Sequence, residues 1–277
     1  MDQLSYQAAI LLGLVQGAAE FLPVSSSGHL ALLQTFFGVA DSSGVAFDVL
    51  LHLGTLAAVV AAYRRDVLAM LREIVFWLRD LVARRRPGTV PPARRLVLLV
   101  AAGTVPLALV PPVRDAVERF YGNTLFIGCA LLVTGLLLFA ADRIGRGGKT
   151  ETTATVSDAL LVGLAQAAAV VPGLSRSGIT VSMGLARGFH RSFALRYSFL
   201  LSVPAVLAAN LFSLRGAVGT GGTPVSVCLA GMAAAAAAGY GAIRLLRRLA
   251  ERGRFGGFAW YCWITGLIAI AATLLTG

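Results

Sequence analysis

Gln16-Gly-Ala-Ala-Glu-Phe-Leu-Pro-Val-Ser-Ser-Ser-Gly-His29 places amide, carboxylate, hydroxyl and imidazole groups inside a sequence that is otherwise apolar enough to lie in lipid. Polar groups are costly there, so an intramembrane carboxylate or imidazole is a candidate functional group. Gln16 and Glu20 are four residues apart and share one face if this segment is helical. Pro23 would end that helix, and the three serines after it can cap a second helix whose N-terminus points at an anion. The stretch therefore predicts a phosphate site at a helix break.

The composition indicates a polytopic membrane protein. The 277-residue chain is 57% hydrophobic and only 13% charged, which is too apolar for an ordinary soluble domain. Its net charge of +11 gathers in arginine runs beside apolar segments, as in topology-setting loops, and this argues against a nucleic-acid partner. A cleavable signal peptide is not expected, because no Lys or Arg precedes Arg64. The three cysteines are scattered through apolar runs, so we expect neither disulfides nor metal ligands.

The first half of the chain predicts one broken helix and three spans. Residues 5–22 and 26–38 are each shorter than the ~20 residues that a spanning helix needs, so we interpret them as a re-entrant helical hairpin. Residues 66–86 are amphipathic and suit either the interface plane or a short helix packed under the bundle. The predicted spans are residues 44–63, 96–113 and 124–141.

The pattern of the first hairpin restarts later in the chain. Residues 11–28 align with residues 161–178 at a constant offset of 150, with nine of eighteen positions identical. We interpret this as an internal duplication within a single membrane domain, residues 1–277. Repeat one covers about 5–141, a basic loop covers 142–156, and repeat two covers about 157–277. The spans predicted in repeat two are residues 193–214, 225–246 and 258–276.

Each repeat is therefore one hairpin plus three spans, and an odd number of crossings inverts the second copy. The charges agree with this inversion, because the basic segments 64–95, 143–149 and 244–254 would all be cytoplasmic. Both termini and the connections 113–123 and 215–223 would then lie outside. Two inverted hairpins can meet tip to tip near the membrane midplane, as in transporter sites built from broken helices. Gln16, Glu20 and His29 would then face the residues of the second break.

The second break, Pro172-Gly-Leu-Ser-Arg-Ser-Gly-Ile-Thr180, combines an arginine with hydroxyls in a glycine-flanked turn. A planar guanidinium suits bidentate phosphate recognition. With the first break and the segment Arg196-Tyr-Ser-Phe-Leu-Leu-Ser-Val-Pro204, this motif resembles the undecaprenyl-diphosphatase family of bacterial membrane proteins linked to bacitracin resistance. The resemblance covers almost the whole chain. It implies hydrolysis of undecaprenyl diphosphate to the monophosphate carrier lipid and inorganic phosphate, at a site reached from the outer face of the plasma membrane.

The candidate site residues come from both breaks. The predicted catalytic residues are Glu20, Ser26, His29 and Arg176. The predicted substrate-binding residues are Gln16, Ser25, Ser27, Ser175, Ser177 and Thr180. The sequence departs from the family pattern at Gln16, where many members carry Glu, and this weakens a two-carboxylate metal clamp. A divalent cation, Mg²⁺ or Ca²⁺, held by Glu20 is an open hypothesis for a cofactor.

The residue types leave the chemical roles partly open. The resemblance suggests Ser26 as a nucleophile, and His29 competes with it as base or nucleophile. Glu20 would orient or deprotonate His29 or water, or hold the cation. Arg176 and the serine N–H groups would hold the diphosphate charge. His52, one turn from Asp48 on the first span, either lines the cavity or makes a structural hydrogen bond.

A lipid or small-anion transporter or flippase is the alternative function, because inverted repeats with broken helices are the usual architecture of such carriers. A hydrolase needs an acid–base residue beside a nucleophile, and the first break supplies that set. We therefore expect a membrane phosphatase. Its expected partner is a polyprenyl diphosphate lipid within the membrane, and whether it forms a homo-oligomer is open.

Overall fold

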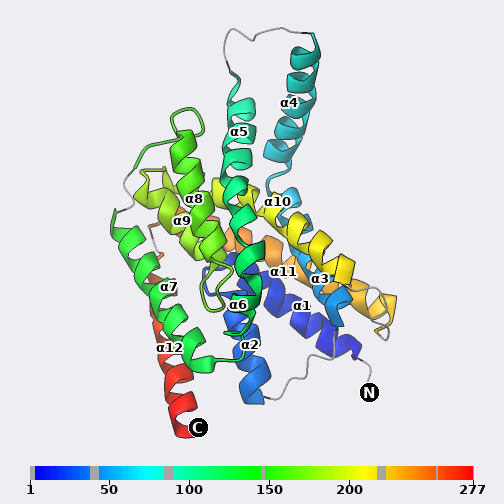
Figure 1. Cartoon of the computed structure of the whole chain (residues 1–277), viewed down its shortest axis with the longest axis vertical. Helices are drawn as coiled ribbons and strands as arrows, with labels where there is room; N and C mark the ends of the chain where they lie inside the picture. The colour runs from blue at the N-terminus through cyan, green and yellow to red at the C-terminus, as the bar shows by residue number, and fades with distance from the viewer. Residues whose placement is uncertain are drawn as a thin grey trace.

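The computed structural model describes residues 4–37, 44–83, 90–144, 147–216, 223–253 and 255–276, which form a bundle of helices (Figure 1). Across these residues, an isolated bridge between Lys149 and Phe189 is the only β-type pairing. The helical segments that are long and apolar enough to cross a membrane are Pro92–Glu118, Thr124–Ile144, Arg191–Ser213, Val225–Glu251 and Gly256–Leu275. The prediction of an all-α polytopic membrane protein is confirmed.

The remaining predicted span is followed by a sharp bend. Helix α3 (Gly44–Ala62) leads into α4 (Arg64–Val82), and the two are bent by 88°. Helix α4 is amphipathic as predicted, but none of its residues is buried, so it is not packed under the bundle. It lies instead beside α5 (Pro92–Thr104), and the two project together from the bundle (Figure 1). Buried Arg94 holds the pair through ion pairs of 3.1 Å to Glu73 and 2.8 Å to Asp80.

Prolines interrupt the span that begins with α5. The chain continues from α5 as the 3₁₀ helices η1 (Val105–Leu109) and η2 (Pro111–Val113) and then as the short helix α6 (Arg114–Glu118). Proline has no backbone N–H and cannot sit in a regular helix interior without breaking its hydrogen-bond ladder. Helix α7 (Thr124–Ile144) then completes the first half.

Both predicted hairpins are present as helix–break–helix units. The first is α1 (Tyr6–Phe21) followed by α2 (Ser26–Phe37), and the second is α8 (Val156–Ala168) followed by α9 (Arg176–Ala186). Their first helices begin with equivalent caps, because the Ser5 hydroxyl accepts from the Ala8 N–H and the Thr155 hydroxyl accepts from the Asp158 N–H. Ser5 and Thr155 are separated by the same offset of 150 residues as the aligned motifs.

The two halves exchange their packing partners. Helix α1 packs against α11 (Val225–Glu251), and its counterpart α8 packs against α5. A glycine permits each crossing, since a Cβ at Gly13 would lie 2.2 Å from the Gly231 carbonyl oxygen and one at Gly163 would lie 2.2 Å from that of Gly103. Gly13 and Gly163 are again 150 residues apart. Equivalent spans also meet each other, α3 with α10 (Arg191–Gly216) and α7 with α12 (Gly256–Thr276). This exchange supports the inferred duplication.

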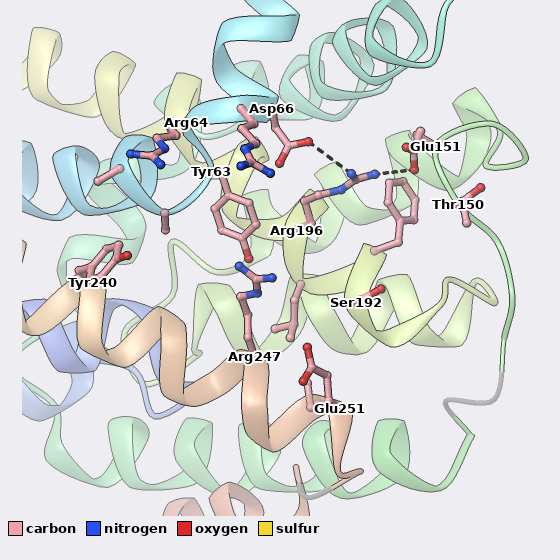
Figure 2. Close-up of a pocket in the computed structure, with 16 residues that line it drawn as sticks. Tyr63, Arg64, Asp66, Thr150, Glu151, Ser192, Arg196, Tyr240, Arg247 and Glu251 are labelled. Atoms are coloured by element: carbon pink, nitrogen blue, oxygen red, sulfur yellow. Dashed lines mark hydrogen bonds and ion pairs between the residues drawn. The ribbon is translucent and has the colours of Figure 1, made fainter.

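The basic segments gather around one cavity of about 680 Å³ (Figure 2). Arg196 at the start of α10 forms ion pairs with Asp66 of α4 and with Glu151 of the loop before α8. Arg247 near the end of α11 lies over the ring of Tyr63, 5.7 Å from its centre. Three segments that the sequence assigned to the cytoplasmic side therefore meet at the same end of the bundle.

Candidate active site

The two helix breaks are in direct contact. A Cβ at Gly28 would lie 3.0 Å from the Gly173 Cα, and one at Gly178 would lie 3.3 Å from the Pro23 Cβ. The Ser177 hydroxyl also donates to the Leu22 carbonyl oxygen at 3.4 Å. The hairpins therefore meet tip to tip, as the internal repeat predicted.

An unusual backbone conformation shapes the first break. Ser25 has a φ of 68°, in the left-handed region that L-residues other than glycine seldom adopt. Its hydroxyl accepts from the Gly28 N–H at 3.2 Å, and its carbonyl accepts from the His29 N–H at 3.2 Å and lies 2.8 Å from His29 Nδ1. In the second break the left-handed residue is Gly173, with a φ of 90°. Local hydrogen bonds thus stabilise a turn at Ser25 for which glycine would be the easier residue.

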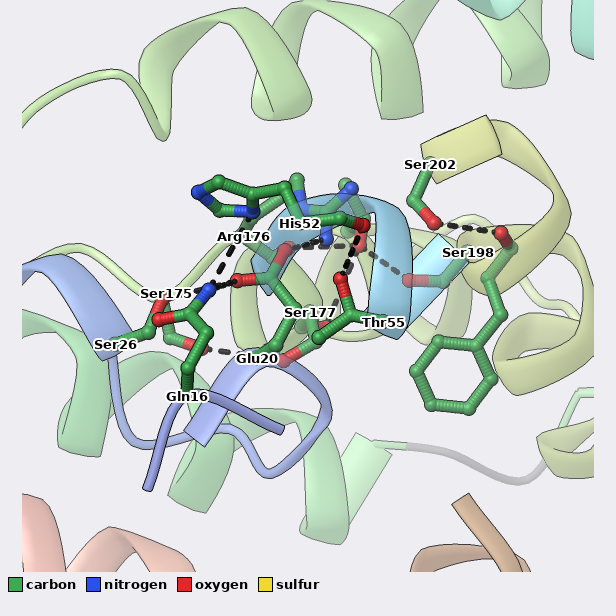
Figure 3. Close-up of polar contacts among 12 residues, drawn as sticks. Gln16, Glu20, Ser26, His52, Thr55, Ser175, Arg176, Ser177, Ser198 and Ser202 are labelled. Atoms are coloured by element: carbon green, nitrogen blue, oxygen red, sulfur yellow. Dashed lines mark hydrogen bonds and ion pairs between the residues drawn. The ribbon is translucent and has the colours of Figure 1, made fainter. Parts of the chain in front are cut away.

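Glu20, near the end of α1, is at the centre of the polar network between the breaks (Figure 3). Its Oε1 is ion-paired with Arg176 Nη2 from the N-terminus of α9. Its Oε2 accepts from Gln16 Nε2 at 3.1 Å and from Ser26 Oγ at 3.1 Å. Glu20 is only 9% exposed, so these three partners compensate for the burial of its carboxylate. The Glu20 carboxylate therefore contacts both the Ser26 hydroxyl and the Arg176 guanidinium.

A cavity of about 560 Å³ lies beside this network. The predicted site residues that line it are Gln16, Glu20, Ser25, Ser26, Ser27, Ser175 and Arg176. His52 and Asp48 line it too, and His52 Nδ1 is 3.4 Å from Gln16 Nε2 (Figure 3). Of the two alternatives left open for His52, both hold: it lines the cavity and it makes a hydrogen-bond contact with Gln16.

Three predicted site residues are not among those that line this cavity. His29 points to a separate apolar cavity of about 940 Å³, where its Nε2 is 2.8 Å from the Tyr261 hydroxyl and the two rings stack at 5.5 Å. Its expected approach to the second break is thus wrong, because the turn at Ser25 directs it toward α12. Thr180 bonds instead to the Arg176 carbonyl at 2.7 Å and the Ser198 hydroxyl at 2.6 Å, while Ser177 supports the contact between the breaks.

The sequence analysis missed three polar residues that line the cavity: Tyr121, Gln166 and Asn210. Gln166 is the counterpart of Gln16 at the offset of 150, so the repeat itself contained the signal. Asn210 is a polar residue within an apolar span, which is a functional candidate by the same argument as Glu20. Tyr121 belongs to the connection after α6, and nothing in its local sequence indicated this position.

The guanidinium of Arg176 is only partly used by the protein. Its Nη2 contacts Glu20, whereas its Nη1 is buried and has no hydrogen-bond partner among the residues that the structure describes. A buried donor without a partner is unfavourable, and a phosphate oxygen in the cavity would satisfy it. Arg176 therefore has the geometry to connect the carboxylate with a bound anion.

The described residues do not form a preformed metal cage. No group of three or more His, Cys, Asp or Glu side chains is placed to hold a metal ion in the part of the chain with a described structure. Both oxygens of Glu20 already have partners. Mg²⁺ usually binds through one or two carboxylates together with substrate phosphates. The arrangement fits a cation that arrives with a diphosphate better than one held by the protein alone.

Comparison with known proteins gives a consistent result. A family model described as bacitracin resistance protein BacA matches residues 9–268. The undecaprenyl-diphosphatase of Methanosphaera stadtmanae is 40% identical over 230 residues, which cover 81% of this chain and 82% of the relative. That of Alkaliphilus metalliredigens is 40% identical over 229 residues, covering 82% and 83%. That of Rubrobacter xylanophilus is 44% identical over 215 residues, covering 77% of each.

Proposed function

The chain belongs to the bacitracin resistance protein BacA family, and we propose from this membership that its cavity hydrolyses undecaprenyl diphosphate to undecaprenyl phosphate and inorganic phosphate. The protein is a membrane phosphatase that recycles the carrier lipid of cell-wall synthesis. The observation that carries the assignment to this cavity is the Glu20 carboxylate, which contacts both the Ser26 hydroxyl and Arg176, whose Nη1 has no partner among the described residues. Such a set can activate an oxygen nucleophile and hold a phosphate in one place.

The geometry favours Ser26 as the nucleophile. Its Oγ would attack the terminal phosphorus while Glu20 Oε2, 3.1 Å away, takes the hydroxyl proton. The bond from that phosphorus to the bridging oxygen breaks, and undecaprenyl phosphate leaves. Water then attacks the phosphorus of the phosphoserine: its hydroxyl bonds to phosphorus and its second proton passes to a phosphoryl oxygen. The bond from phosphorus to Ser26 Oγ breaks, Glu20 returns its proton to Oγ, and inorganic phosphate departs. Arg176 would hold the charge of the transferred phosphoryl group throughout.

His29 acts in this scheme as a positioning residue. Because the Ser25 carbonyl can only accept, His29 Nδ1 must donate to it, and in a neutral ring Nε2 then accepts from the Tyr261 hydroxyl. Both ring nitrogens are therefore engaged outside the cavity. The imidazole would stabilise the left-handed turn that directs Ser26 toward Glu20.

A divalent cation is part of the proposal. Glu20 and Asp48 are the acidic residues that line the cavity, and either could contact Mg²⁺ or Ca²⁺ bound to diphosphate oxygens. Such a cation would neutralise charge on the transferred phosphoryl group. Removing divalent cations with EDTA should then lower phosphate release by roughly tenfold or more, and adding back Mg²⁺ or Ca²⁺ should restore it. Unchanged activity in EDTA would leave Arg176 as the cationic group of the site.

The outer face is the proposed side of access. Tyr121, in a connection that the charge pattern assigns to the outside, lines the site cavity, whereas the basic segments surround a different cavity. We also propose that both termini lie outside the plasma membrane. The transporter alternative has no support from the relatives named above.

The decisive experiment measures phosphate release by the purified protein in detergent. Without a sealed membrane there is no gradient and no second compartment, so a carrier would have no activity. We expect undecaprenyl diphosphate to yield equal amounts of undecaprenyl phosphate and inorganic phosphate. A Glu20→Gln variant of unchanged melting temperature is the matched control, and it should release almost none. Binding of the lipid without hydrolysis by the wild-type protein would refute the proposal.

A further inference from the structure

Buried polar atoms without partners concentrate at one cavity. In the described part of the chain, the residues that carry them are Arg95, Gln166, Arg176, Ser182 and Asn210. Three of these, Gln166, Arg176 and Asn210, line the site cavity. Native proteins satisfy nearly all buried polar groups, so such a cluster at a cavity indicates a missing ligand.

Of the two amides, Gln166 has more unpaired polar atoms. Its side-chain nitrogen and oxygen both lack partners, and the residue is only 3% exposed. An amide left unpaired at this depth costs free energy that a bound acceptor would recover. Asn210 from α10 adds a second unpaired amide nitrogen and is 6% exposed.

The internal repeat explains why Gln166 lacks a partner. Its counterpart Gln16 donates to the carboxylate of Glu20, four residues later in the same helix. The residue at the position equivalent to Glu20 is Val170, so the second repeat has kept the amide and lost the anion that it binds. A phosphate oxygen of the substrate can occupy the place of that carboxylate.

We propose that Gln166 and Asn210 form a subsite for the lipid-linked phosphate of the diphosphate, the group that leaves as undecaprenyl phosphate. This inference rests on the proposed function. The terminal phosphate, which is transferred, then lies next to Ser26 and is held by Arg176 and the serines of the first break. The amides are neutral donors, which suit the less charged, diester-like phosphate, and the cavity wall around them includes Val170 and Val206, which suit the start of the lipid chain.

The two halves of the protein thus contribute different groups around the bound diphosphate. Repeat one supplies the carboxylate and the hydroxyl, and repeat two supplies amide donors and the guanidinium. Two phosphate-binding subsites would explain a preference for a diphosphate lipid over a lipid that carries one phosphate. The leaving group is also stabilised by hydrogen bonds as its charge develops.

The test uses Gln166→Leu and Asn210→Leu, which replace each amide by an apolar side chain of roughly similar shape and remove the donors. We expect each to raise KM for undecaprenyl diphosphate roughly tenfold, the usual effect of one hydrogen bond to a charged group. The inhibition constant of undecaprenyl phosphate should rise by the same factor, while that of inorganic phosphate should stay within about twofold. Ser182→Ala removes a buried unpaired hydroxyl that does not line the cavity, so it should change none of these constants.

Melting temperature in detergent without substrate separates binding from structure. Replacing an unpaired buried amide by an apolar group of similar shape should leave the melting temperature unchanged or raise it. A clear drop would mean a structural role and would overturn the proposal, as would an unchanged inhibition constant for undecaprenyl phosphate. An equal rise for inorganic phosphate would overturn the assignment to the lipid-linked phosphate.

Phosphate release tests the proposed function, and binding of undecaprenyl phosphate tests the amide subsite separately. If the wild-type protein released no phosphate, the function would fail, yet undecaprenyl phosphate should still raise its melting temperature through the amide subsite. If the enzyme is active and the two leucine variants bind undecaprenyl phosphate like wild type, only the subsite is refuted.

Discussion

Arg176 connects the buried carboxylate with the cavity, because Nη2 contacts Glu20 and Nη1 has no hydrogen-bond partner in the described part of the chain. Arg176→Lys keeps the charge but offers a single ammonium in place of the planar two-pronged group. We expect phosphate release to fall by about 10²-fold or more, the range measured when one preorganised donor is lost. Steady-state kinetics in detergent, with expression and melting temperature matched to wild type, would measure it. Near wild-type turnover would remove Arg176 from the site.

The roles proposed for Ser26 and His29 can be told apart by the phosphoenzyme that each variant forms. Ser26→Ala removes the attacking oxygen, so it should abolish both turnover and the phosphoenzyme. His29→Ala should slow the reaction by loosening the turn at Ser25 while retaining an acid-stable phosphoserine. Acid-quench trapping with terminally labelled substrate distinguishes these outcomes. An acid-labile, base-stable label that survives in Ser26→Ala would instead identify histidine as the nucleophile.

The sequence predicted the site residues whose position follows from composition and spacing. Glu20 and Arg176 stand out because ionisable groups in apolar helices must face a partner or a cavity. The direction of His29 was not predictable, because it depends on the φ of 68° at Ser25, a conformation that serine seldom adopts. Asn210 was missed because a single amide in a long apolar helix has no local motif around it.

Close helix crossings hold the duplicated elements together, and Gly163 tests one of them. Gly163→Ala would place its Cβ 2.2 Å from the Gly103 carbonyl oxygen, so α8 and α5 would have to move apart. We expect a destabilisation of about 1–3 kcal/mol, typical of overpacking, seen as a lower melting temperature in detergent. Gly241→Ala is the control, since beyond its own stretch of helix no atom of the described residues would lie within 4 Å of its Cβ, and alanine favours the helix. Equal melting temperatures for the two variants would contradict the role of this crossing.

The ion pair between Arg196 and Glu151 connects α10 to the loop before α8. Burial raises the pKa of Glu151, but the hydrogen bond and charge of Arg196 outweigh it and hold the pKa below its ordinary value of 4.5. A lowered folded-state pKa contributes stability above about pH 4.5 that is lost as the pH falls further. Glu151→Gln should therefore lower the free energy of unfolding at pH 7 by about 1 kcal/mol or less, seen as a slightly lower melting temperature. The deficit should shrink in acid, and a deficit independent of pH would exclude the ion pair as its cause.

Helix boundaries were predictable where prolines and caps mark them, and long-range pairing was not. Pro23 and Pro172 interrupt both hairpins, and each hairpin was expected from sequence alone. The position of α4 depends on ion pairs from Arg94 to acidic residues of α4, contacts that join elements on either side of a loop. Amphipathicity identified the helix but could not identify the surface on which it lies.

At the scale of the whole molecule, the duplication and the charge pattern together imply an orientation. The segments around the cavity of Figure 2 carry the arginine runs that the positive-inside rule assigns to the cytoplasm. The site cavity is lined from the opposite set of connections, through Tyr121. A substrate whose diphosphate faces the outer leaflet would then reach Glu20 without passing the basic end.

Single cysteines can test this orientation in intact cells, after Cys129, the exposed native cysteine, is replaced by serine. Arg119→Cys lies in the connection 113–123, which also holds Tyr121, and Arg248→Cys lies near the basic end of α11; both positions are exposed. A membrane-impermeant maleimide should label Arg119→Cys in whole cells and Arg248→Cys only after lysis. The reverse labelling pattern would show the opposite orientation, with the site open to the cytoplasm. Because charge bias sets orientation, adding arginines to the connection that holds Arg119 should also weaken correct insertion, whereas adding glutamates there should have little effect.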